Sequence, residues 1–298
     1  MRGRVVRAPV RFLLAIAILA SLAIWHLPVS AQAQAWSCDV PAPATPAASP
    51  TPAATPQPVE FPDEGGKLTV FAAASLTDAF TKIADDLKTT HPNLEITFNF
   101  AGSQALVTQI AEGGAQADVL ALASPAQMKS AVEDGIPVEG SATFVTNRLT
   151  VVVPADNPAG IASVADLAKD GVRLVLANPD VPAGNYARQS LCKTAAAGGP
   201  SVEDYAANIV SEEDNVRSVL TKVELGEADA GIVYVTDATT SGDKVQSIEI
   251  PADQNVVASY PIATIGDNPL AAAFVGYVFS PEGQATMTSF GFDPVSAI

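Results

Sequence analysis

The chain has 298 residues, a formal net charge of −16 at pH 7, two cysteines and two histidines. This length is enough for one large domain or for two smaller ones with buried cores. The strongly acidic composition excludes nucleic acids and anionic membrane surfaces as expected partners, because the Coulomb interaction has the wrong sign.

Residues 1–35 have the pattern of a secretory signal peptide. Four arginines precede an apolar run over 12–25, and Ala-X-Ala sequences follow at 31–35. The run is shorter than the roughly 20 residues that span a bilayer. We expect export to the periplasm or the cell exterior, with an uncleaved membrane anchor as the alternative. Loss of this segment, with its four arginines and no acidic residue, changes the net charge from −16 to −20.

A linker rich in proline, alanine and threonine is predicted over 36–64. Its proline content favours an extended, semi-rigid segment. Cys38 lies near its start, and three interpretations of this residue stay open. It is a lipid-carrying residue that makes the protein a lipoprotein, it forms a disulfide with Cys192, or the two thiols are unrelated. Trp36 argues against the first, since it fits poorly before a lipid-modified cysteine.

From residue 67 on, strand-like apolar runs alternate with helical patterns, which is typical of βαβ units and of mostly parallel sheets with helices on both faces. The predicted fold class is therefore α/β. Strands are predicted at 68–73, 94–100, 119–123, 148–153, 173–177, 230–234 and 256–264. Helices are predicted at 77–90, 103–112, 125–133, 164–169, 183–197, 215–226 and 269–280.

The folded part is long for a single sheet, so we predict two α/β lobes. Lobe I comprises 65–147 and 258–298, and lobe II comprises 148–257. The chain crosses twice between them, near 146–150 and 256–260. Two crossings make a hinged pair of lobes.

The predicted strand-to-helix turns are rich in small and hydroxyl residues, and ligands of open α/β sheets bind at such turns. A helix N-terminus offers unpaired N–H groups and a positive dipole end, so it binds an anion without a basic side chain. Each serine alone also fits an ordinary N-cap. Together the set offers donors and no carboxylate, which suits a fully deprotonated oxyanion. The set is Ser75, Ser103, Ala183, Val216 and Tyr234.

Five segments carry a resemblance to a known family. FAAASLTDAF, NFAGSQALVTQIAEGGAQADVLALAS, NPDVPAGNYARQSL, EEDNVRSVL and ADAGIVYVTDA occur in this order. Together they closely resemble the periplasmic molybdate-binding proteins of ABC transporters. The resemblance covers residues from 67 to the C-terminus and implies the type II periplasmic-binding-protein fold, with two lobes around one cleft.

The resemblance also implies the residues that bind the oxyanion. Ser75 and Ser103 would donate from lobe I, and Ala183, Val216 and Tyr234 from lobe II.

Two departures from the family pattern affect this assignment. Gly102 stands where many members carry another serine. The extra residue Asn215 leaves open whether Asn215 or Val216 supplies the backbone donor.

The function implied is capture of molybdate, and of tungstate, for a membrane permease that an ATPase drives. We expect a monomer without a cofactor. The alternative is a carrier of sulfate, phosphate or a small organic solute, for which Arg188 and Arg217 lie one turn into their helices.

An enzyme or a metal carrier is not expected. A serine hydrolase at Ser75 would need a base, and beyond residue 35 the sequence has only His91 and no G-x-S-x-G turn. A metal site would need clustered His, Cys or carboxylate ligands, and the short acidic runs are typical of solvated surface. We therefore expect no catalytic residues and no metal ligands.

Overall fold

The computed structural model describes residues 36, 38, 61–62 and 64–295. The predicted signal peptide and most of the predicted linker lie outside these residues. In the part of the chain that is described, none of the helices combines the length and apolar composition needed to cross a bilayer.

The strands are β1 (Gly66–Ala73), β2 (Leu94–Ala101), β3 (Val119–Ala121), β4 (Val138–Pro154), β5 (Leu174–Ala177), β6 (Ile209–Glu213), β7 (Ala230–Tyr234), β8 (Val245–Glu249), β9 (Val257–Ile265) and β10 (Asp293–Pro294). The α-helices are α1 (Thr77–Thr90), α2 (Ser103–Ala111), α3 (Pro125–Glu133), α4 (Pro182–Ala196), α5 (Val202–Ala207), α6 (Val216–Glu224), α7 (Val235–Ser241), α8 (Pro269–Phe279) and α9 (Pro281–Ser289). Three short 3₁₀ helices are η1 (Ala74–Leu76), η2 (Val164–Ala168) and η3 (Gly242–Lys244).

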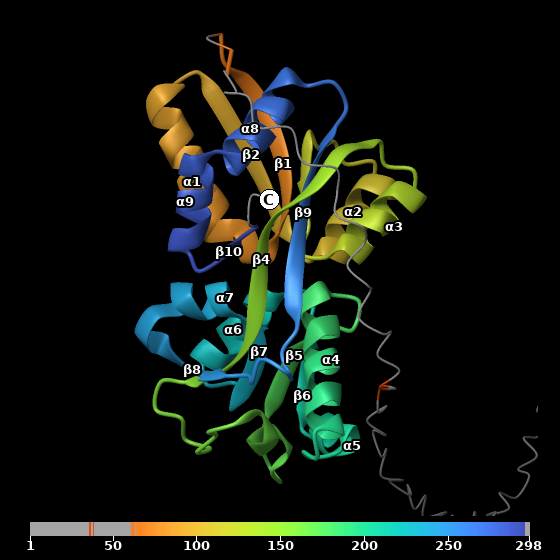
Figure 1. The fold of residues 1–298 in the computed structure, drawn as a ribbon, viewed down its shortest axis with the longest axis vertical. Coiled ribbons are helices and arrows are strands. Elements are labelled where there is room, and N and C mark those ends of the chain that lie inside the picture. Colours follow the sequence, from red (N-terminus) through yellow and green to blue (C-terminus); the bar gives the residue numbers. More distant parts are fainter. Residues whose placement is uncertain (1–35, 37, 39–60, 63, 296–298) are drawn as a thin grey trace, which may run out of the picture. The chain divides into compact units, whose positions relative to one another are not determined.

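Two groups of strands form the centres of two lobes. We call the first lobe the sheet A lobe. In it, β1 pairs in parallel with β2 and β3, and β3 pairs antiparallel with β9. In the second, the sheet B lobe, β5 pairs in parallel with β6 and β7. Helices α1, α2, α3, α8 and α9 accompany sheet A, and α4, α5, α6 and α7 accompany sheet B (Figure 1). The predicted α/β class is thus confirmed.

The long strand β4 belongs to both sheets. It pairs antiparallel with β9 as far as Arg148, and with β7 and β8 from Leu149 on. Figure 1 shows β4 and β9 running side by side from one lobe to the other. Because these crossing strands pair antiparallel, the sheets are mixed rather than mostly parallel as predicted. In this ladder Asn147 lies opposite Ala258 and Arg148 opposite Val257.

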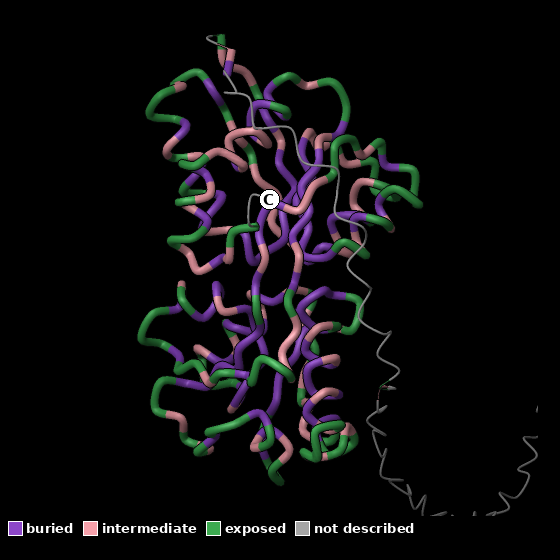
Figure 2. The backbone as a smooth tube through the Cα atoms, viewed as in Figure 1, coloured by how far each residue is buried: buried purple, intermediate pink, exposed green. Residues whose placement is uncertain are grey.

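The core of each lobe follows from the apolar faces of its elements, and buried segments run through both centres in Figure 2. On α1, the residues Phe80, Ile83 and Leu87 recur at helical spacing and are buried. The Phe80 ring packs edge-on against Phe274 of α8, with 5.5 Å between the ring centroids. It also packs against Phe144 of β4, with 5.9 Å between the ring centroids. These contacts pack the first turn of α1 against α8 and β4.

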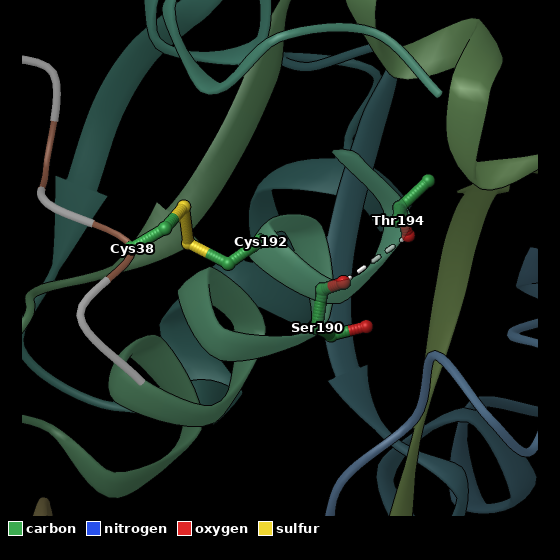
Figure 3. Close-up of a disulfide and its surroundings, with 4 residues drawn as sticks. All are labelled: Cys38, Ser190, Cys192 and Thr194. Atoms are coloured by element: carbon green, nitrogen blue, oxygen red, sulfur yellow. Dashed lines mark hydrogen bonds between the residues drawn. A yellow bond between two sulfur atoms is a disulfide. The ribbon is translucent and has the colours of Figure 1, made fainter. Parts of the chain in front are cut away.

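A disulfide joins Cys38 to Cys192 of α4 (Figure 3). Of the three interpretations of Cys38, the disulfide is therefore the one observed. Lipid attachment at Cys38 is wrong, because a sulfur in a disulfide has no thiol left to form a thioether. Nearby, the Trp36 ring lies over the Arg188 guanidinium, 5.5 Å from ring centroid to carbon.

Candidate functional site

A small pocket lies between the two lobes, where β1, β2 and β7 end and α2, α4 and α6 begin. It encloses about 210 Å³ of space, part of which is open to solvent. All five residues predicted from the sequence line it, so the structure brings them together. The lining residues are Ala73, Ala74, Ser75, Ala101, Gly102, Ser103, Ala123, Val181, Pro182, Ala183, Asn215, Val216 and Tyr234.

Two buried serines form the sheet A side of the pocket. Ser75 lies in η1, directly after β1, and is 3% exposed. Ser103 is the first residue of α2, and its Oγ accepts a hydrogen bond from the Ala123 N–H at 3.1 Å. Because that bond uses only a lone pair of the oxygen, the Ser103 hydroxyl keeps its proton for a ligand.

Two helix starts form the sheet B side. Pro182 and Ala183 are the first two residues of α4, and Val216 is the first of α6. Backbone N–H groups in a first turn have no partner within their helix, so Ala183 and Val216 present donors. The Asn215 side chain instead caps α6 by accepting from the Ser218 N–H at 3.0 Å.

Tyr234, at the end of β7, completes the lining with a buried hydroxyl. The residue is 1% exposed, and its Oη has no hydrogen-bond partner among the described residues. Burial raises the pKa of the Tyr234 phenol well above its ordinary value, so the group stays protonated. An unpaired buried donor is costly, and a bound acceptor would remove that cost.

The pocket lining, as described, contains no charged side chain. Arg188 lies behind it, where its Nη1 donates to the carbonyls of Ala177 and Gly184 at 2.8 and 2.9 Å and its Nη2 pairs with Glu212. These bonds hold the turn that leads into α4. Arg217 also stays out of the lining and pairs with carboxylates. Neither arginine is placed to recognise the carboxylate of an organic solute.

The lobes contact each other at the rim of the pocket. Gln104 Nε2 donates to the Asp214 carbonyl at 3.0 Å, and Gln127 Nε2 donates to the Asp180 carbonyl at 3.2 Å. Gly102 lies in the same contact, since a Cβ atom added there would be 2.4 Å from the Asp214 oxygen. Glycine therefore allows this close approach, which a residue with a Cβ atom would not fit.

The family model of the bacterial extracellular solute-binding proteins matches residues 68–293. The chain belongs to this family. It is a family of solute-binding proteins and not of enzymes, and its extracellular character agrees with the predicted export.

This solute-binding protein resembles proteins named for molybdate. It is 39% identical over 238 residues to the molybdate-binding protein ModA of Mycobacterium tuberculosis (strain H37Rv), covering 78% of this chain and 86% of the relative. It is 34% identical over 235 residues to ModA of Haemophilus influenzae, covering 76% and 89%.

A solved structure gives the fold independently. The Azotobacter vinelandii periplasmic molybdate-binding protein superposes with a TM-score of 0.66 at 18% identity, covering 77% of this chain and all of that chain. At this identity the likeness shows the fold alone. The predicted two-lobed type II fold is thereby confirmed.

Sequence reasoning missed the residues directly behind the pocket. Tyr260 Oη lies 2.9 Å from Ser75 Oγ, and Asn147 contacts Tyr260 in turn. Tyr260 sits inside an apolar strand pattern, where a tyrosine carries no local sign of a role. No signal in a single sequence would have identified it.

Proposed function

We propose that this protein captures molybdate in the pocket between its lobes. The observation that supports the proposal best is the pocket lining: five donors predicted from the sequence lie together around one space without a charged side chain. Donors alone suit molybdate, which is a fully deprotonated dianion at neutral pH. Hydrogen phosphate would place its own proton against a donor, at a cost of about 1–3 kcal/mol.

The binding energy in this proposal comes from preorganised hydrogen bonds to a charge. Each bond of that type contributes about 1.5–3 kcal/mol. Ser103 and Tyr234 have free protons, and Ala183 and Val216 add N–H groups at the positive ends of helix dipoles. Several such bonds offset the loss of the dianion's water. No cofactor takes part.

Size gives the selectivity. Sulfate is smaller than molybdate, so it does not reach all the donors from both lobes at once. Tungstate has nearly the same size and charge and is expected to bind as well. The lobes close on the ion by bending at the crossings in β4 and β9, and the closed monomer delivers it to a membrane permease that an ATPase drives.

The experiment is calorimetric titration of the purified protein with molybdate, tungstate, sulfate and phosphate in turn. Tight one-to-one binding of molybdate and tungstate, with no heat from the other two, is expected. Preferential binding of sulfate or phosphate would keep the site and change the substrate. No binding of any of the four would overturn the proposal.

A further inference from the structure

A buried tyrosine stands behind one of the pocket serines. Tyr260 of β9 is fully buried and does not line the pocket, yet its Oη lies 2.9 Å from Ser75 Oγ. Either hydroxyl can donate in such a pair. The direction matters, because a Ser75 that gives its proton to Tyr260 has none left for an anion.

The surroundings of Tyr260 favour one direction. Asn147, also fully buried, is held by its neighbours: its Oδ1 accepts from the Arg148 N–H at 2.9 Å, and its Nδ2 donates to Thr236 Oγ1 at 2.9 Å. The amide nitrogen therefore faces Tyr260 Oη, at 3.5 Å. With an N–H directed at its oxygen, Tyr260 has its own proton available for Ser75 Oγ.

We propose that Tyr260 is a positioning residue for anion binding, which acts by donating to Ser75 Oγ and so directing the Ser75 proton into the pocket. The inference rests on the proposed function. It gives the two strands that cross between the lobes a part in anion binding, because Asn147 lies on β4 and Tyr260 on β9. Thr236 of α7 is the far end of the same chain of bonds.

Two further observations agree with this role. Burial raises the pKa of Tyr260 above its ordinary value, so the phenol keeps its proton at neutral pH. In addition, Ser75 Oγ has Tyr260 as its hydrogen-bond partner among the described residues. Without the Tyr260 hydroxyl, the Ser75 proton would have no fixed orientation.

The test is a pair of double-mutant cycles on the whole protein, read as the Kd for molybdate. Tyr260→Phe removes one oxygen and keeps the ring, and it is expected to raise the Kd about 5- to 20-fold. In a Ser75→Ala background the same change is expected to add less than about twofold, because its target is gone. In a Ser103→Ala background it should add its full effect, since Ser103 does not contact Tyr260.

Tyr205→Phe is the matched control. Tyr205 of α5 is also fully buried, and its Oη has no hydrogen-bond partner among the described residues, but it does not line the pocket. The Kd of the Tyr205→Phe variant for molybdate should equal that of the parent protein. Thermal melting of every variant shows whether each is folded before its Kd is compared.

Each outcome decides the matter. An unchanged Kd in Tyr260→Phe overturns the inference and leaves the proposed function intact, and so does a full effect of Tyr260→Phe in the Ser75→Ala background. A loss in both Tyr→Phe variants would show general loosening of the core, which also overturns it. A parent protein that does not bind molybdate would overturn the proposed function and the inference with it.

Discussion

Arg217 of the sheet B lobe forms an ion pair with Asp78 of the sheet A lobe. Its Nε also lies 2.7 Å from Oδ1 of Asp237, a buried residue of its own lobe. The three charges lie outside the pocket lining, so they do not touch a bound ion. Because Arg217 and Asp78 belong to different lobes, their ion pair stabilises the contact between the lobes, and in the proposed function that contact holds the lobes closed on the ion.

Asp78→Asn should therefore weaken molybdate binding. Both partners are partly exposed, so we expect a modest loss of about 0.5–1 kcal/mol, or about two- to fivefold in Kd. The loss should shrink as salt rises, because salt screens exposed pairs. Calorimetric titrations of the variant and the parent with molybdate, at low and at high ionic strength, measure this change in Kd. Asp86→Asn is the control, because Asp86 pairs with Lys82 within the same helix α1; an equal loss there would remove the closure role from Asp78.

A second prediction concerns the close approach at Gly102. Its φ of −60° and ψ of 140° suit any residue, so Gly102→Ala should not strain the backbone. The added Cβ would instead collide with the Asp214 carbonyl of the other lobe. We expect the Kd for molybdate to rise about tenfold or more, with a melting temperature close to that of the parent.

Gly114→Ala provides the opposite case. Gly114 has a φ of +65° and open space around it, so alanine there is strained without touching the other lobe. It should lower the melting temperature and leave the Kd unchanged. If Gly102→Ala behaved in the same way, the lobe contact at Gly102 would not matter for binding.

The positions of the pocket residues were predictable because their signals are local. Ser75 and Ser103 each follow an apolar run and begin a helical pattern, and parallel strands bring such turns to one edge of a sheet. Pro182 is also a local signal, because proline favours the first position of a helix, and it is the first residue of α4. The predicted residues thus lie together in the structure, while their binding of an anion stays a prediction.

What escaped prediction depends on contacts distant in sequence. The helix α7 has the polar sequence VTDATTS, and the first part of β4 is largely exposed, so neither shows an apolar period. Both are held by pairing and packing against other elements. Likewise, the bond between Ser75 and Tyr260 joins residues 185 positions apart. No pattern within one segment encodes such a pair.

A third prediction concerns the disulfide. Cys38 and Cys192 are 154 positions apart, and a loop of that size removes much conformational entropy from the unfolded chain. Cys192→Ser should lower the free energy of unfolding by about 3–5 kcal/mol, measured by urea denaturation. Cys38→Ser should have the same effect, and the double variant no more. The Kd for molybdate should not change, because neither cysteine lines the pocket; additive losses would mean that the two cysteines act separately.

The last prediction concerns Asp237 and pH. Burial raises the pKa of its carboxyl from 3.8 to about 6, although the nearby Arg217 acts to lower it. Between these two pH values the folded protein binds a proton that the unfolded chain has released. The contribution of this group to stability is therefore favourable at low pH and is lost as the pH rises through about 4 to 6, by about 3 kcal/mol in all.

Asp237→Asn removes this dependence, because the amide does not titrate and still offers an oxygen to the Tyr234 N–H that Asp237 Oδ2 now accepts at 3.2 Å. The free energy of unfolding of the variant minus that of the parent should therefore increase steadily between pH 4 and pH 6.5. Taking the difference cancels the other carboxyl groups, which titrate in both proteins. Urea denaturation at four or five pH values measures it. A difference that stayed flat across this range would show that Asp237 remains ionised in the folded protein, held so by Arg217.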